Sequence, residues 1–122
     1  MQKDTIFALS TPQGVGGVAV IRISGPQAQA ALQALFQPAG TSPMEPRKLI
    51  YGRFVFDGTQ IDDGMAVLFC APASYTGEDS AELHCHGSLA VVQQLLGALG
   101  TLPGLRPAEP GEFTKRAFLH GK

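Results

Sequence analysis

Apolar residues recur along the chain with two different periods, which predict two kinds of element. Short apolar runs that are continuous or alternate with polar residues, and are rich in β-branched side chains, predict strands. These runs cover residues 5–9, 18–23, 49–56, 65–70, 81–86 and 105–108. Apolar residues three and four positions apart predict helices over residues 26–36 and 88–100, and a third helical segment follows Gly111.

Local signals refine the limits of these elements. Ser88 is expected to cap the second helix, and Ser24 and Gly25 stand where the first helix should be capped. Asp57-Gly58 predicts the turn of a hairpin between residues 49–56 and 65–70. The buried stripe of the second helix is expected to comprise Leu89, Val92, Leu96 and Leu99.

The order of the elements predicts the fold class. Strands and helices do not alternate strictly, so a mixed sheet with helices packed on it, an α+β fold, is favoured over a parallel sheet. We expect a ferredoxin-like core within one domain over residues 1–122. The last helical segment runs to Lys122 without a stop signal beyond it, so we expect a chain that is cut at this point.

The strand over residues 81–86 carries the most chemistry. Its period of two separates an apolar face from a polar one: Ala81, Leu83 and Cys85 on the first, Glu82, His84 and His86 on the second. The polar three could ligate zinc or iron, with His120 as a fourth ligand. Residues two apart on a strand stand about 6–7 Å apart, which is long for one shared ion. This distance favours the alternative, a polar face that lines a cleft.

Arg22 interrupts an otherwise apolar strand. A guanidinium in a central strand needs an anionic partner, because burying it unpaired is costly. One hypothesis is a structural carboxylate, and the other is the anionic group of a ligand. The carboxylates considered as structural partners are Glu82, Asp79 and Glu112.

Three further segments receive a simpler interpretation. Residues 14–19 fit a relaxed dinucleotide-binding pattern, but they open a strand and no Gly-Lys-Ser/Thr follows, so a loop at a pocket rim or interface is favoured. Asp62-Asp63 is expected in a solvated turn. Lys115-Arg116 is expected on a solvated helix face.

Composition narrows the function classes. Lys and Arg number 9 against 10 Asp and Glu, and no basic stripe forms, which argues against unaided nucleic-acid binding. No apolar run approaches the roughly 20 residues of a membrane span, and the polar start lacks signal-peptide features, so we expect a cytoplasmic protein. Cys70 and Cys85 lie in strand-like segments, which predicts reduced thiols rather than a disulfide.

Longer motifs carry a resemblance that covers nearly the whole chain. They are residues 71–79, 82–87 and 110–119, together with shorter matches in residues 4–12, 16–18 and 21–25. In these segments the sequence resembles the N-terminal domain of the tRNA modification GTPase family known as MnmE or TrmE. One departure is Val15, where the family commonly has an arginine.

The resemblance implies a function and a site. Family members act with the flavin-dependent partner MnmG on carbon 5 of the wobble uridine of tRNA, so tRNA is met through the full complex. Their N-terminal domain forms a homodimer and binds a tetrahydrofolate derivative, 5-formyl- or 5,10-methylene-tetrahydrofolate. Carried over by position, the folate-contacting residues are Arg22, Glu82 and Lys122.

The resemblance also implies what this chain does not do. GTP, magnesium and potassium belong to a GTPase domain that these residues do not include, so we expect no GTP hydrolysis by this chain. Two alternatives stay open: a small metal-dependent hydrolase using Glu82, His84 and His86, or a dimerisation module that binds no ligand.

Overall fold

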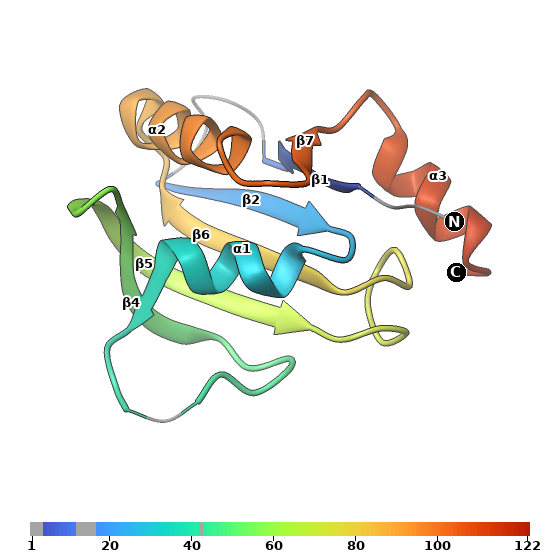
Figure 1. Cartoon of the computed structure of the whole chain (residues 1–122), viewed down its shortest axis with the longest axis horizontal. Coiled ribbons are helices and arrows are strands. Elements are labelled where there is room, and N and C mark those ends of the chain that lie inside the picture. The colour runs from blue at the N-terminus through green and yellow to red at the C-terminus, as the bar shows by residue number, and fades with distance from the viewer. Residues whose placement is uncertain (1–3, 12–16, 42) are drawn as a thin grey trace.

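The described part of the chain folds into one curved sheet and three helices (Figure 1). The computed structural model describes residues 4–11, 17–41 and 43–122. Its elements, in chain order, are β1 (Thr5–Leu9), β2 (Val18–Ser24), α1 (Ala28–Leu35), β3 (Phe36–Pro38), β4 (Ile50–Phe56), β5 (Thr59–Phe69), β6 (Ser80–His86), α2 (Leu89–Gly100), β7 (Leu105–Pro107) and α3 (Glu112–Leu119).

The sheet is mixed, which confirms the predicted α+β class. Among the residues described, seven strands follow the order β3-β4-β5-β6-β2-β1-β7, and β1 and β7 are the one pair in parallel. The series β2-α1-β5-β6-α2-β7 has the connectivity of a ferredoxin-like core. Two additions modify that core: β1 stands between β2 and β7, and β3 and β4 extend the opposite edge.

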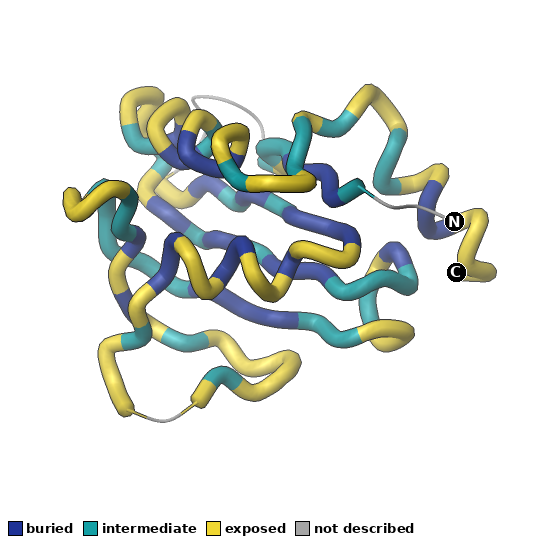
Figure 2. Tube along the Cα trace, viewed as in Figure 1, coloured by how far each residue is buried: buried dark blue, intermediate teal, exposed yellow. Residues whose placement is uncertain are grey.

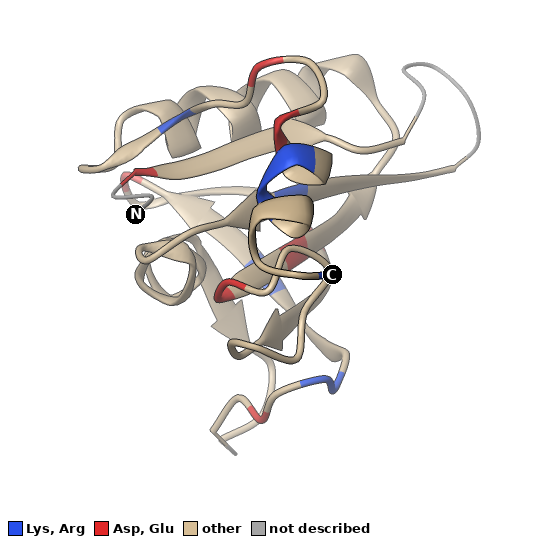
Figure 3. Cartoon of the chain, turned by 90° about the vertical axis from the view of Figure 1, so that its right-hand side faces the viewer, with Lys and Arg blue, Asp and Glu red and all other residues tan. Residues whose placement is uncertain are grey.

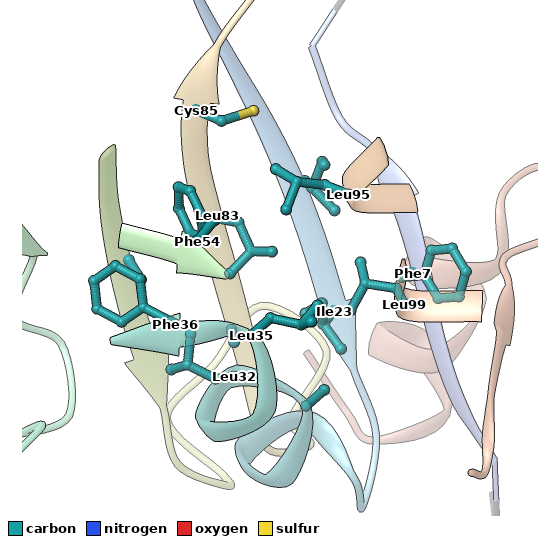
Figure 4. Packing of buried hydrophobic residues seen from close by; sticks show 14 of the residues in the cluster. Phe7, Ile23, Leu32, Leu35, Phe36, Phe54, Leu83, Cys85, Leu95 and Leu99 are labelled. Carbon is teal, nitrogen blue, oxygen red and sulfur yellow. The ribbon is translucent and has the colours of Figure 1, made fainter. Parts of the chain in front are cut away.

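Helices α1 and α2 cover one face of the sheet, and the hydrophobic core lies between them and the strands. Figure 2 shows burial along the central strands and on the sides of both helices that face them. In Figure 4, Leu35 of α1 and Leu99 of α2 point toward Ile23 of β2 and Leu83 of β6. Phe36 and Phe54, whose ring centroids lie 5.3 Å apart, extend this core toward the β3 edge.

The predicted alternation along residues 81–86 is confirmed. Leu83 and Cys85 are buried, whereas Glu82 and His84 are only partly buried and His86 is exposed. Both cysteines are free thiols, and burial raises the pKa of the Cys85 thiol to about 11. In the described part of the chain, no helix is long and apolar enough to cross a membrane.

One of the two predicted helix caps is present in the structure. Ser88 caps α2 as expected, accepting a hydrogen bond from the Val91 N–H at 3.1 Å. Ser24 does not cap α1. That helix begins at Ala28, and the N–H of the preceding Gln27 donates to Thr5 Oγ1 at 2.7 Å. Helix α1 therefore begins without a side-chain cap, and Thr5 of β1 holds its N-cap residue in place.

The buried stripe of α2 differs from the prediction. Its buried residues are Val92, Leu95, Ala98 and Leu99. Leu89 is 56% exposed because it belongs to the first turn and points away from the sheet-facing stripe, and Leu96 is only half-buried.

The β4–β5 hairpin is longer than predicted. Asp57 and Gly58 form its turn with φ values of 53° and 78°, the left-handed conformation that a two-residue hairpin loop requires. Strand β5 starts directly after this turn and pairs with β4 along its length. Asp62 and Asp63 therefore lie within a paired strand, and the prediction of a solvated turn there is wrong.

Two leucines of α2 test this description of the core. Leu95→Ala removes a fully buried side chain and should lower the free energy of unfolding by about 2–5 kcal/mol. Leu89→Ala, in the same helix, removes an exposed side chain and should change it by less than about 0.5 kcal/mol. Urea unfolding followed by circular dichroism measures both. Equal losses would contradict the observed orientation of α2.

Candidate ligand-binding site

A cavity of about 390 Å³ lies on the sheet face opposite α1 and α2. Side chains on β2 alternate between faces, so Arg22 points away from the core that contains Ile21 and Ile23. The three residues carried over from the family, Arg22, Glu82 and Lys122, all line this cavity. Arg47, Ser74 and Tyr75 line it with them.

The centre of the site is a charged pair on two neighbouring strands. Arg22 of β2 stands directly opposite Glu82 of β6 in the antiparallel register. Its Nη2 lies 3.4 Å from Glu82 Oε2, and both side chains are partly exposed. Within the part of the chain that the structure describes, Glu82 is thus the carboxylate that Arg22 pairs with, as one of the two hypotheses required.

Glu82 has a second partner on its own strand. His84 Nε2 and Glu82 Oε1 are 3.0 Å apart. This hydrogen bond, followed by the charge of Arg22, lowers the pKa of Glu82 below its ordinary value although partial burial opposes the shift. The carboxyl group is therefore an anion at neutral pH. A carboxylate offers about four acceptor positions, so it can still accept hydrogen bonds from a ligand.

Two aromatic rings flank Arg22. Its Cζ lies 5.2 Å from the ring centroid of Tyr75 and 5.9 Å from that of Phe113 on α3. Aromatic rings at these distances attract a guanidinium and restrict its orientation. Tyr75 is itself half exposed and lines the cavity, so the same ring that holds Arg22 is available to a planar ligand.

The wall beside Tyr75 is the loop over residues 71–79. Asp79 Oδ1 accepts a hydrogen bond from the Ala71 N–H at 2.8 Å, which closes the ends of the loop. Buried Thr76 lies in hydrogen-bond contact with Ser24 of β2, with 2.6 Å between their hydroxyl oxygens. The loop is thus fastened to the end of the strand that carries Arg22.

Lys122 follows helix α3 in the chain. A buried arginine, Arg116, holds this helix in place. Arg116 is fully buried, so the prediction of a solvated face at Lys115-Arg116 is wrong for Arg116 and right for exposed Lys115. The guanidinium of Arg116 lies 2.8 Å from Asp4, 3.2 Å from Glu78 and 3.4 Å from Glu112. The physical reason for the error is that two of these carboxylates are distant in sequence.

Arg106 of β7 completes this ion-pair cluster. It binds both Asp4 and Glu112, each at 2.5 Å. Its hydrogen bond is the largest cause that lowers the pKa of Glu112 to about 2, and it also lowers the pKa of Asp4. Glu112 therefore stays ionised well into the acid range.

The predicted metal ligands do not converge. His84 binds Glu82, whereas His86 Nδ1 turns to Asp62 on β5 at 2.9 Å. His120 Nδ1 lies 2.8 Å from the Arg116 carbonyl oxygen. Among the described residues, the three side chains close enough to share an ion are Asp62, Asp63 and His86, a different set from the predicted one.

Sequence reasoning missed several residues of the site. Arg47 belongs to an irregular connection, and its N–H donates to the Leu68 carbonyl oxygen at 2.7 Å, which places it over β5. Tyr75 and Phe113 fall inside the motifs that carry the family resemblance, and that was the one available signal for them. Residues 14–16, including Val15, lie outside the described residues, so the expected pocket rim there has no structural counterpart to compare.

The fold and the cavity together define a small α+β domain with a charged candidate ligand site. The family described as "GTP-binding protein TrmE N-terminus" matches residues 5–122. The chain is 54% identical over 121 residues to the tRNA modification GTPase MnmE of Parvibaculum lavamentivorans, which covers 98% of the chain and 27% of that protein. The protein of the same name from Rhodospirillum rubrum is 48% identical over 136 residues, covering 100% and 29%.

A third relative gives the same result. The tRNA modification GTPase MnmE of Natranaerobius thermophilus is 46% identical over 125 residues, covering 100% of the chain and 27% of that protein. The chain belongs to the family of TrmE N-terminal domains. It spans between a quarter and a third of the length of these curated relatives, and it corresponds to their N-terminal domain.

The ion-pair cluster predicts how stability depends on pH. The pKa of Glu112 is about 2 in the folded chain and near 4.5 when unfolded, so its stabilisation is complete above pH 4.5 and is lost as the pH falls toward 2. Asp4 adds a change of the same sign. The free energy of unfolding, measured with urea at several pH values, should therefore fall over this range.

Substitution of Glu112 isolates this contribution. Glu112→Gln should cost about 1.5–3 kcal/mol at pH 7 and progressively less toward pH 2, where the native carboxyl group is also neutral. Glu109→Gln, an exposed carboxylate three residues earlier, is the matched control. A Glu112→Gln variant with the same deficit at every pH would contradict the assignment.

Proposed function

We propose that this chain is the tetrahydrofolate-binding and homodimerising module of a tRNA-modifying GTPase. The observation that carries the proposal is the pairing of Glu82 and Arg22 at a cavity of about 390 Å³ that Tyr75 and Lys122 also line. This volume falls within the range of about 300–1,000 Å³ typical of small-molecule sites.

The chemistry of a reduced folate matches these groups. Its pterin presents an amino group and a ring N–H side by side, and an ionised carboxylate such as Glu82 accepts both. Its glutamate tail is anionic, and the cavity offers three cations in Arg22, Arg47 and Lys122. The Tyr75 ring provides a surface for the flat pterin or benzoyl group.

In this proposal the chain contributes a one-carbon donor to a larger reaction. The relatives are named tRNA modification GTPases. We infer that 5-formyl- or 5,10-methylene-tetrahydrofolate bound here serves the modification of carbon 5 of the wobble uridine, in the cytoplasm and together with the flavin-dependent partner MnmG. GTP hydrolysis, with its magnesium and potassium, belongs to other parts of such a protein, and tRNA is bound by the full complex.

The folate site can be tested at Glu82. Glu82→Ala removes the carboxylate that accepts the pterin donor pair and should weaken binding of 5-formyltetrahydrofolate by about 2–4 kcal/mol, roughly 30- to 1,000-fold in Kd. His84→Ala should weaken it less, because His84 touches Glu82 and does not line the cavity. Arg22→Ala should also weaken binding, by an amount that decreases with added salt. Calorimetry measures all three.

Two controls separate the outcomes of this titration. Lys115→Ala removes an exposed cation outside the cavity and should leave the Kd unchanged. Circular dichroism establishes that each variant is folded. Unchanged folate affinity in folded Glu82→Ala would overturn the site, and a metal requirement abolished by His84→Ala would favour the hydrolase alternative.

Exposed apolar side chains support the dimer. Phe118 and Leu119 at the end of α3 are 80% and 57% exposed, and Tyr75, which lines the same surface hollow as Phe118, is 51% exposed. Clustered apolar exposure of this kind is typical of an interaction surface. A second copy of the chain is the partner that the family resemblance implies.

Light scattering tests the dimer directly. The wild-type chain at micromolar concentration should give twice the monomer mass of 12.8 kDa. Phe118→Asp should shift the mass toward the monomer, whereas Leu49→Asp, a half-exposed leucine in the connection before β4, should not. A monomeric wild type at all concentrations is the result that excludes the proposal.

A further inference from the structure

We propose that Arg116 is a positioning residue for the candidate pocket: it ties the 71–79 loop and helix α3 to each other, and so fixes Tyr75 and Lys122 relative to Arg22 and Glu82. The identity of the ligand rests on the proposed function, whereas the mechanical link does not. Arg116 does not line the cavity itself.

The link to the loop passes through Glu78. Arg116 Nη1 lies 3.2 Å from each carboxylate oxygen of Glu78. The Ser24 hydroxyl donates to Glu78 Oε1 at 2.9 Å and contacts Thr76 at 2.6 Å. One carboxylate therefore connects the buried guanidinium to both the loop and the end of β2. Displacing Glu78 releases the segment that carries Tyr75.

The link to α3 is Arg116 itself. The buried residues of this helix are Arg116 and Ala117, while Phe118 and Leu119 point outward. With so little apolar burial, the helix is attached mainly by ion pairs: Arg116 binds Asp4 and Glu78, and Glu112 binds Arg106 of β7. Of these ion pairs, that of Arg116 with Glu78 is the one that reaches the 71–79 loop. Figure 3, which looks at this end of the molecule, shows acidic positions on the segments around the basic positions of α3.

The loop and the chain end are also in direct contact. The Lys122 N–H donates to the Ala117 carbonyl oxygen at 2.9 Å, so Lys122 follows the position of α3. At Gly77, a Cβ would lie 2.7 Å from the Cβ of His120, and the residue has φ of +83°. A side chain at position 77 would push the two walls apart, which shows how closely they approach.

A guanidinium suits this task better than an apolar side chain. Burial of a charged group is costly, and well-packed apolar residues often stabilise a fold as much or more. The planar fork of Arg116, however, fixes several carboxylates from different segments in defined directions. Its value here is therefore the relative placement of two pocket walls.

Hydrogen exchange measured by mass spectrometry tests the link without any ligand. In the 122-residue chain, Arg116→Met should accelerate amide exchange at least tenfold in residues 71–79 and 112–122, and leave the core strands and α2 protected. Arg116→Lys should show a smaller acceleration because the charge remains. Lys115→Met, which removes an exposed cation from the same helix, should match the wild type.

A gentler variant covers the case in which Arg116→Met does not fold. Glu78→Gln weakens the link to the loop and leaves Arg116 bound to Asp4 and Glu112. It should accelerate exchange in residues 71–79 while residues 112–119 stay protected. Unchanged exchange in the loop, or an equal acceleration throughout the chain, would overturn the proposal.

Tyrosine fluorescence gives a second, local signal. The chain has two tyrosines and no tryptophan, so in a Tyr51→Phe background Tyr75 is the single emitter. Adding Arg116→Met should lower its fluorescence anisotropy, and adding Lys115→Met should not. An anisotropy unaffected by Arg116→Met would contradict the link.

Folate titration then connects the link to function. The Kd for 5-formyltetrahydrofolate should rise at least tenfold in Arg116→Met and less in Arg116→Lys. If the wild type does not bind folate, the proposed function fails, and the exchange and fluorescence results still decide the role of Arg116. If the wild type binds and folded Arg116→Met binds equally well, the positioning role is overturned while the folate site stands.

Discussion

The antiparallel register between β2 and β6 is the constraint on which the core and the candidate site both depend. It places Ile21 opposite Leu83 on the helix-covered face and Arg22 opposite Glu82 on the other. A shift of one residue in a strand pairing exchanges its two faces, so it would bring charged side chains into the core and leucines to the cavity. Because core packing specifies this register strongly, the charge pair is held by the folding energy of the whole sheet.

The two sides of the cavity are held by different forces. Arg22 and Glu82 stand on central strands stabilised by apolar packing, whereas Tyr75 and Lys122 come from a loop and a chain end stabilised by ion pairs and hydrogen bonds. Apolar burial is insensitive to pH and salt in comparison with ion pairing. Solution conditions should therefore act on one side of the cavity before the other.

The sequence predicted the strands whose alternation of buried and partly exposed residues reflects pairing on both sides within the sheet. Residues 81–86 alternate because β6 is paired on both sides and covered on one face, so period two is a direct record of its surroundings. Arg22 was recognised as unusual because its charge interrupts the apolar pattern of a central strand. The errors concern residues whose environment is set from far along the chain. Arg116 has the local pattern of a solvated charge, yet its carboxylate partners Asp4 and Glu78 lie 112 and 38 residues away.

The alternation of core-facing and cavity-facing residues on the central strands affects which substitutions such a domain can accept. On β2 and β6, neighbouring positions serve separate purposes: Ile23 and Leu83 fill the core, while Arg22 and Glu82 face the cavity. Substitutions at sites that share no partners are close to additive in free energy. The cavity-facing pair Arg22 and Glu82 is coupled within itself but shares no partner with the core, so it can change as a unit with little cost to core packing. A sheet covered on one face is therefore a scaffold on which ligand preference and foldability are inherited almost independently.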